Sequence, residues 1–278
     1  MNDINKIDAF IASHPNFKNQ KPEKREHISD MILACVARTN TDIDRLMELI
    51  KLDKALDVTC LGKNSGNVFD YIEPSLLGFA RKIFNKKGNG TPNAASGKGE
   101  LMFCFMSYMI KDPTKGDIEC NDDTYEFKTN GGKISKGSGI EVNAEVVKKC
   151  RKARIKLPVA ATGKTAKGKP QFIPCDPKHQ RALGKKYITV LSYWWKALSG
   201  KSLPKNIKKW DDLVPHVITV LAKPVFDSND AIVCFDKNGD FEIFRKPKDL
   251  LESKYNSKNA QWEMRCYQKN PIALYLGQ

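Results

Sequence analysis

Residues 115–129 read KGDIECNDDTYEFKT, and this stretch decides how the chain is interpreted. Within it, residues 115–120 and 124–129 alternate polar and apolar side chains, as short strands do. The residues between them, 121–123 (NDD), favour a tight turn. The stretch therefore predicts a β-hairpin, and the two-residue period of a strand indicates which side chains share a face.

One face of this hairpin is expected to gather charged side chains. Glu126 and Lys128 are two residues apart and project together, while Tyr125 and Phe127 face the opposite, buried side. An antiparallel partner strand that carries Asp117 brings a second carboxylate beside them. Carboxylates with waters suit Mg²⁺, which polarises a phosphodiester, and a lysine can orient the attacking water. The cluster predicts a site that hydrolyses phosphate esters.

The segments upstream of the hairpin differ in composition. Residues 100–111 (ELMFCFMSYMIK) are apolar on nearly all sides, which predicts a buried helix with Glu100 near its N-terminal end. Residues 86–99 are rich in glycine and small polar residues, which indicates a loop or linker. Before that linker, residues 1–85 carry apolar stripes at helical spacing and predict a helical region.

The downstream half is expected to alternate helices and strands. The clearest pattern is a hairpin of residues 231–235 and 241–244, joined through the Asn-Gly turn of DKNGD. The remaining expected elements are a basic helix at 144–153, two segments of helix or strand at 187–198 and 210–221, a short helix at 248–254, and strands at 262–267 and 272–276.

Positive charge is concentrated in one segment. The 278 residues include 47 Lys and Arg against 32 Asp and Glu, a net charge of +15. Residues 128–209 hold 21 of the basic groups and three acidic ones, a net of +18, so the remainder is slightly acidic. Such an excess favours a polyanion, and nucleic acid above all. The residues expected to contact DNA are Asn130, Lys133, Lys136, Lys148, Lys149, Arg151, Lys152, Arg154, Lys156, Lys164, Lys167 and Lys169.

Composition excludes several other classes of protein. No two of the eight cysteines lie closer than 16 residues, which excludes a Cys-x-x-Cys metal or redox motif and favours scattered buried thiols. The longest apolar stretch is too short for a membrane span, and no secretory signal is visible. We therefore expect a cytoplasmic protein with no membrane partner, located in the bacterial host cytoplasm if a phage encodes it.

The motif formed by residues 116–117 (GD), residues 126–128 (EFK) and Glu100 resembles the PD-(D/E)xK nuclease superfamily, which includes many restriction endonucleases. The resemblance covers about residues 97–135. It implies that Asp117 and Glu126 bind the metal, that Lys128 serves the attacking water, and that Glu100 completes the metal site. Gly116 stands where the motif's name has proline, a departure that leaves both metal ligands in place.

The resemblance implies an α/β fold with a restriction-endonuclease-like core, a mixed β-sheet flanked by helices, and an added N-terminal helical region. The expected domains are 1–95, which is helical, and 96–278, the nuclease with its basic DNA-binding segment. The expected activity is a Mg²⁺-dependent DNA endonuclease, with Mn²⁺ as a substitute, double-stranded DNA as substrate and a homodimer as the assembly that cuts two strands.

Other interpretations remain open from the sequence alone. The hairpin could carry only a surface ion pair between Glu126 and Lys128. The protein would then be a non-catalytic nucleic-acid-binding or phage structural protein. Catalysis could also act on branched DNA, as in a resolvase, or on RNA. Glu119, on the same strand face as Asp117, is an additional candidate ligand.

Overall fold

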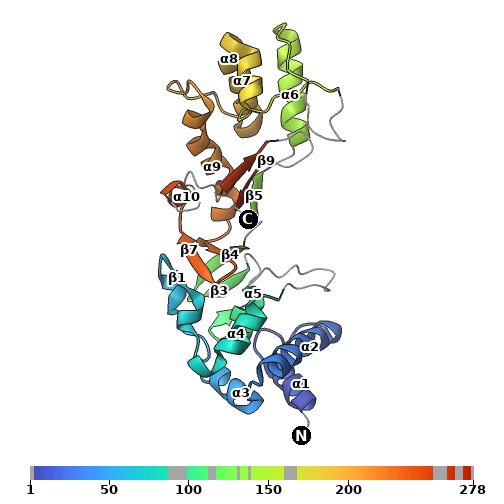
Figure 1. Ribbon diagram of the computed structural model, residues 1–278, viewed down its shortest axis with the longest axis vertical. Helices are drawn as coiled ribbons and strands as arrows, with labels where there is room; N and C mark the ends of the chain where they lie inside the picture. Colours follow the sequence, from blue (N-terminus) through green and yellow to red (C-terminus); the bar gives the residue numbers. More distant parts are fainter. Residues whose placement is uncertain are drawn as a thin grey trace. The chain divides into compact units, whose positions relative to one another are not determined.

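The chain forms an α/β structure with two sheets (Figure 1). The computed structural model describes residues 3–86, 99–111, 117–129, 132–136, 139–159, 168–252, 262–266 and 272–276. No helix within these ranges is both long enough and apolar enough to span a membrane.

Two compact units make up the fold. Unit 1 comprises residues 1–130 and 225–246, and unit 2 comprises residues 131–224 and 247–278. These units do not coincide with the ranges 1–95 and 96–278 expected from the sequence. The physical reason is that the N-terminal helices share one hydrophobic core with the sheet that follows them, so no boundary falls between the two.

The helices of unit 1 confirm the expected N-terminal helical region. They are α1 (Asp3–Ser13), α2 (Pro22–Thr39), α3 (Ile43–Lys51), α4 (Leu77–Phe84) and α5 (Glu100–Met106), with the short 3₁₀ turns η1 (Val58–Gly62), η2 (Val68–Tyr71) and η3 (Pro74–Leu76). The helix α3 begins where the Asp42 carboxylate accepts hydrogen bonds from the backbone N–H groups of Asp44 and Arg45.

The sheet of unit 1 has six strands in the order β1-β7-β6-β4-β3-β2. The strands are β1 (Ser65–Asn67), β2 (Ile110–Lys111), β3 (Ile118–Cys120), β4 (Asp123–Thr129), β6 (Ala231–Phe235) and β7 (Asp240–Phe244). Only β4 and β6 pair in parallel, and the other neighbours are antiparallel. Both expected hairpins, β3–β4 and β6–β7, are therefore present in one mixed sheet.

The turn between β3 and β4 is tighter than expected. Asn121 and Asp122 have φ of +51° and +67°, the left-handed region that both positions of a two-residue hairpin loop require. Asp123, expected in the turn, is already the first residue of β4 and pairs with Cys120.

The buried helix is shorter than the expected 100–111 because residues 107 and 108 form hydrogen bonds with a side chain from another part of unit 1. Ser107 has extended backbone, and its hydroxyl donates to the Asp53 carboxylate at 2.9 Å. The same carboxylate accepts from the N–H of Tyr108 at 2.7 Å. These bonds draw the chain out of the helix toward β2, so residues 110–111 are strand.

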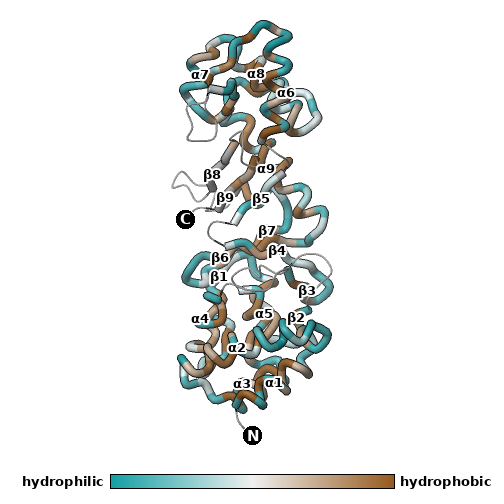
Figure 2. The backbone as a smooth tube through the Cα atoms, turned by 90° about the vertical axis from the view of Figure 1, so that its right-hand side faces the viewer, coloured by the Kyte–Doolittle hydropathy of each residue, from teal (hydrophilic) through white to brown (hydrophobic). Residues whose placement is uncertain are grey.

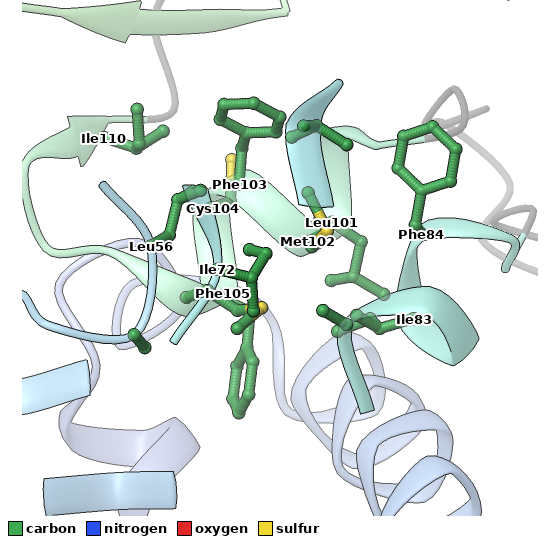
Figure 3. Close-up of a cluster of buried hydrophobic side chains, with 14 of the residues drawn as sticks. Leu56, Ile72, Ile83, Phe84, Leu101, Met102, Phe103, Cys104, Phe105 and Ile110 are labelled. Atoms are coloured by element: carbon green, nitrogen blue, oxygen red, sulfur yellow. The ribbon is translucent and has the colours of Figure 1, made fainter. Parts of the chain in front are cut away.

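The core of unit 1 is built around α5. Each of the residues 101–106 is buried, and Figure 3 shows most of them among side chains such as Ile72 and Ile110. Three aromatic rings, Phe103, Phe127 and Phe235, join α5 to β4 and β6, with ring centroids 5.1 to 6.0 Å apart. Figure 2 shows α5 in the hydrophobic colour over most of its length. The helix is therefore the support on which one face of the sheet rests.

Unit 2 combines helices with a small antiparallel sheet of order β5-β9-β8. Its elements are β5 (Lys133–Lys136), α6 (Gly139–Lys152), α7 (Pro177–Leu183), η4 (Gly184–Lys186), α8 (Tyr187–Ser199), α9 (Trp210–Phe226, ending in unit 1), α10 (Asp249–Glu252), β8 (Trp262–Arg265) and β9 (Ile272–Leu276). The two segments that the sequence left as helix or strand, 187–198 and 210–221, are helices.

Candidate active site

The β3–β4 hairpin places the two predicted carboxylates side by side. Ile118 pairs with Tyr125, so continuing the antiparallel register by one residue sets Asp117 opposite Glu126. The N–H of Asp117 donates to the carbonyl oxygen of Tyr125 at 2.9 Å, which holds this register. The spacing of nine residues between the two acids is therefore the geometry of a short hairpin. Gly116, which replaces the proline of the motif's name, lies outside the described residues.

Glu126 and Lys128 share the face opposite the core, as expected. Phe127, between them, is buried against the aromatic rings of α5 and β6, and this anchor fixes which way its neighbours point. Lys128 Nζ donates to Glu126 Oε1. The lysine and glutamate side chains keep only 18% and 22% of their exposure, so this pair is partly desolvated and differs from an exposed surface ion pair.

Glu100 reaches the site from the first turn of α5. Gly99, just before the helix, has φ of +91°, and a Cβ there would lie 3.2 Å from the Phe84 ring. A glycine is thus required for the chain to enter α5 at this angle. A side-chain hydrogen bond joins Glu100 to Asp117.

The electrostatics of Asp117 show how crowded the carboxylates are. Burial, and then the charge of Glu126, raise the pKa of Asp117 above its ordinary value. The bond with Glu100, the N–H of Phe127 (2.7 Å to Asp117 Oδ2) and the charge of Lys128 act in the opposite direction. All four predicted catalytic residues therefore meet at one point of the structure, where the charged form of an acid is disfavoured.

The oxygen donors at this point suit a divalent cation, but they are not already arranged around a metal position. Among the residues the structure describes, no group of three or more His, Cys, Asp or Glu side chains is arranged to hold a metal ion. Glu126 is turned to Lys128, and Asp117 is bonded to Glu100. Mg²⁺ needs only one or two protein carboxylates besides waters, and it would relieve the crowding of acids. Asp117, Glu126 and Glu100 are the acids at this point that could hold it.

Most of the expected DNA contacts lie on the surface of unit 2. Lys133 and Lys136 belong to β5, and the side chain of Lys136 is not described. Three further expected contacts lie outside the described residues altogether: Asn130, Lys164 and Lys167. Six of the expected contacts in α6 or later in unit 2 have exposed side chains: Lys148, Arg151, Lys152, Arg154, Lys156 and Lys169. Lys149 differs, because it is partly buried and pairs with Glu145 at 3.4 Å.

The division into units separates the charges to the same extent as the sequence segment did. Unit 2 carries 26 Lys and Arg against eight Asp and Glu, a net of +18, and unit 1 carries 21 against 24, a net of −3. Every proposed catalytic residue belongs to unit 1. The carboxylate site and the surface suited to a polyanion are therefore parts of different units.

One further acid on the site's face was missed from the sequence. Glu242 in β7 pairs with Cys234 in β6, which pairs in turn with Lys128. Residues paired in this way point to the same face of a sheet. The alternation of Glu242 with the apolar Phe241 and Ile243 is plain in the sequence. Its nearness to Lys128, however, depends on pairing between strands about 100 residues apart, which no local pattern indicates.

Comparison with known proteins adds no family to this description. No protein-family model, curated protein or solved structure matches the chain. The function has to be argued from the site itself.

Proposed function

We propose that the protein is a Mg²⁺-dependent DNA endonuclease whose unit 1 has a restriction-endonuclease-like core. The observation that carries this proposal is the meeting of Asp117, Glu126, Lys128 and Glu100 at one partly buried point of a mixed sheet. Carboxylates beside a lysine are the equipment for activating water against a phosphodiester. The net charge of +18 on unit 2 supports a polyanionic substrate.

Each residue has a distinct role in the proposed reaction. Asp117 and Glu126 would hold the metal, which when bound supplies a Lewis acid and a more acidic water. Glu100, hydrogen-bonded to Asp117, would complete the metal site, and the N–H of Phe127 donates to Asp117 Oδ2 and orients that carboxylate. Lys128 orients the attacking water and offsets the negative charge that develops on the phosphate.

A plasmid cleavage assay tests the proposal. Supercoiled DNA is incubated with Mg²⁺ and with wild type, Asp117→Asn, Lys128→Met or the control Glu48→Gln. Glu48 is an exposed acid of α3 that pairs with Arg45 at 2.9 Å and has no place in the proposed site, so its replacement should leave the rate unchanged. Each of the two site variants should lose at least about a hundredfold in rate.

The outcomes separate the proposed activity from its rivals. An intact plasmid with wild type would favour a non-catalytic nucleic-acid-binding or phage structural protein. Site variants that cut as fast as wild type would remove these residues from the mechanism. Four-way junctions and RNA in the same assay decide between an endonuclease, a resolvase and a ribonuclease, and chemical crosslinking in the presence of DNA tests the proposed homodimer.

A further inference from the structure

Glu242 has a buried carboxylate oxygen for which the roles given above provide no partner. Its Oε2 is buried and has no hydrogen-bond partner, and it is the one carboxylate oxygen in that condition among the described residues. An unsatisfied carboxylate oxygen is costly to bury, so a native protein normally keeps one only where a second state satisfies it.

Its place in the sheet identifies the side chain that could satisfy it. Lys128 in β4, Cys234 in β6 and Glu242 in β7 form one row across the sheet, all on the same face. Two strand spacings put the backbones of Lys128 and Glu242 about 9–10 Å apart. The long side chains of lysine and glutamate together span that distance, and the small Cys234 between them leaves room for the approach.

The state of Glu126 decides which acid Lys128 meets. In the structure, Lys128 is held by Glu126. Glu126 is also one of the acids proposed to hold Mg²⁺, and a carboxylate that binds a cation becomes a weaker partner for an ammonium group. Lys128 then needs another acceptor, and the row across the sheet offers the unsatisfied oxygen of Glu242.

We infer that Glu242 is a positioning residue that accepts Lys128 when a divalent cation holds Glu126. It keeps the ammonium group over the site in the metal-bound state and so acts on the reaction only through Lys128. This inference rests on the proposed function for its meaning, but the pairing itself can be measured without any cleavage.

The primary test measures how readily Lys128 is modified. Wild type, Glu242→Gln and the control Glu48→Gln are treated with trace amounts of an amine-acylating reagent, with and without Mg²⁺ alone, and the acylation of Lys128 is quantified by mass spectrometry. With Mg²⁺, Glu242→Gln should raise Lys128 acylation about fivefold, the equivalent of about 1 kcal/mol of pairing. Without Mg²⁺ the rise should stay below about twofold, because Glu126 still holds the lysine. A rise that is absent, or equal with and without Mg²⁺, overturns the inference.

Cleavage kinetics give a second readout that distinguishes positioning from structural damage. Glu242→Gln should lower kcat about tenfold with little change in KM, and the double variant Lys128→Met/Glu242→Gln should be no slower than Lys128→Met alone. Additive losses overturn the inference while leaving the nuclease proposal intact. If wild type cuts nothing, the nuclease proposal fails, and the acylation result alone decides whether Glu242 accepts Lys128.

Discussion

Replacing Asn16 by alanine should loosen α5, the helix that carries Glu100. Asn16 is 9% exposed, and its amide donates to the carbonyl oxygens of Cys104 and Ile110, each at 2.8 Å. The first of these belongs to the last turn of α5, where carbonyls lack helical partners. Two buried hydrogen bonds at about 0.5–1.5 kcal/mol each, with the packing lost in truncation, predict a destabilisation of about 2 kcal/mol.

The assay for this variant has to report on unit 1. All four tryptophans, at 194, 195, 210 and 262, belong to unit 2, so intrinsic fluorescence follows the other unit. Amide hydrogen exchange of peptides from α5 reports on unit 1 directly. A destabilisation of about 2 kcal/mol corresponds to a loss of protection against exchange of about thirtyfold. Asn16→Ala should leave the fluorescence transition of unit 2 unchanged.

A matched control is provided by Asn85, an exposed asparagine whose amide donates to the carbonyl oxygen of Arg81 near the end of α4, at 3.0 Å. Because water can replace that bond, Asn85→Ala should reduce protection in α4 by less than about threefold. If Asn16→Ala changes α5 protection by no more than this, the idea that Asn16 anchors the helix is refuted.

Three further predictions address pH, a turn and the basic unit. His14 is buried, and burial lowers its pKa to about 4. Between pH 6.5 and 4 the unfolded chain therefore binds a proton that the folded chain does not, and the free energy of unfolding of unit 1 should fall by about 3 kcal/mol as the pH drops through that window. His14→Gln should flatten this pH dependence of stability, as measured by hydrogen exchange. Gly239→Ala should destabilise the β6–β7 hairpin by about 2 kcal/mol or more, measured by exchange in β7, since φ there is +88° and the new Cβ would lie 2.5 Å from the Phe69 ring. Replacing Arg151 and Lys152 by alanine should reduce the salt slope of DNA binding by about 2 in filter-binding titrations, and an unchanged slope would remove α6 from the interface.

Local patterns predicted the hairpins of unit 1 well because each is closed by its own turn residues. The alternation around Glu126 and Lys128 also identified the correct buried side, since Phe127 packs against the core. What no local pattern indicated is the parallel pairing of β4 with β6, which joins residues 125–129 to residues 231–235. That pairing joins strands separated by about 100 residues and depends on the burial of both. The position of Glu242 beside the site follows from it.

The end of α5 shows the same limit at a single residue. The apolar run continues past Met106 and predicts more helix, but the Asp53 carboxylate at the end of α3 accepts hydrogen bonds from the Ser107 hydroxyl and from the backbone N–H groups of residues 108 and 109. Asp53 itself adopts φ of +50° directly after α3, where the N–H groups of Asp53 and Lys54 donate to the carbonyl oxygens of Ile50 and Leu49 and end that helix. Helix length here is set by a tertiary hydrogen-bond acceptor, which periodicity cannot detect.

Under the proposed function, the order of segments explains how the slightly acidic unit 1 and the strongly basic unit 2 can serve the same substrate. Adjacent parallel strands always need a crossover connection, and here the connection from β4 to β6 contains residues 131–224 of unit 2. The chain therefore passes into the basic unit shortly after Lys128 and returns at residue 225, shortly before β6. Under the proposed function, a nucleic acid bound by unit 2 would be tethered through the chain to unit 1, which raises its effective concentration for the carboxylate site. Deleting charge from unit 2 should thus weaken substrate capture, raising KM, while removal of Asp117 should act on kcat.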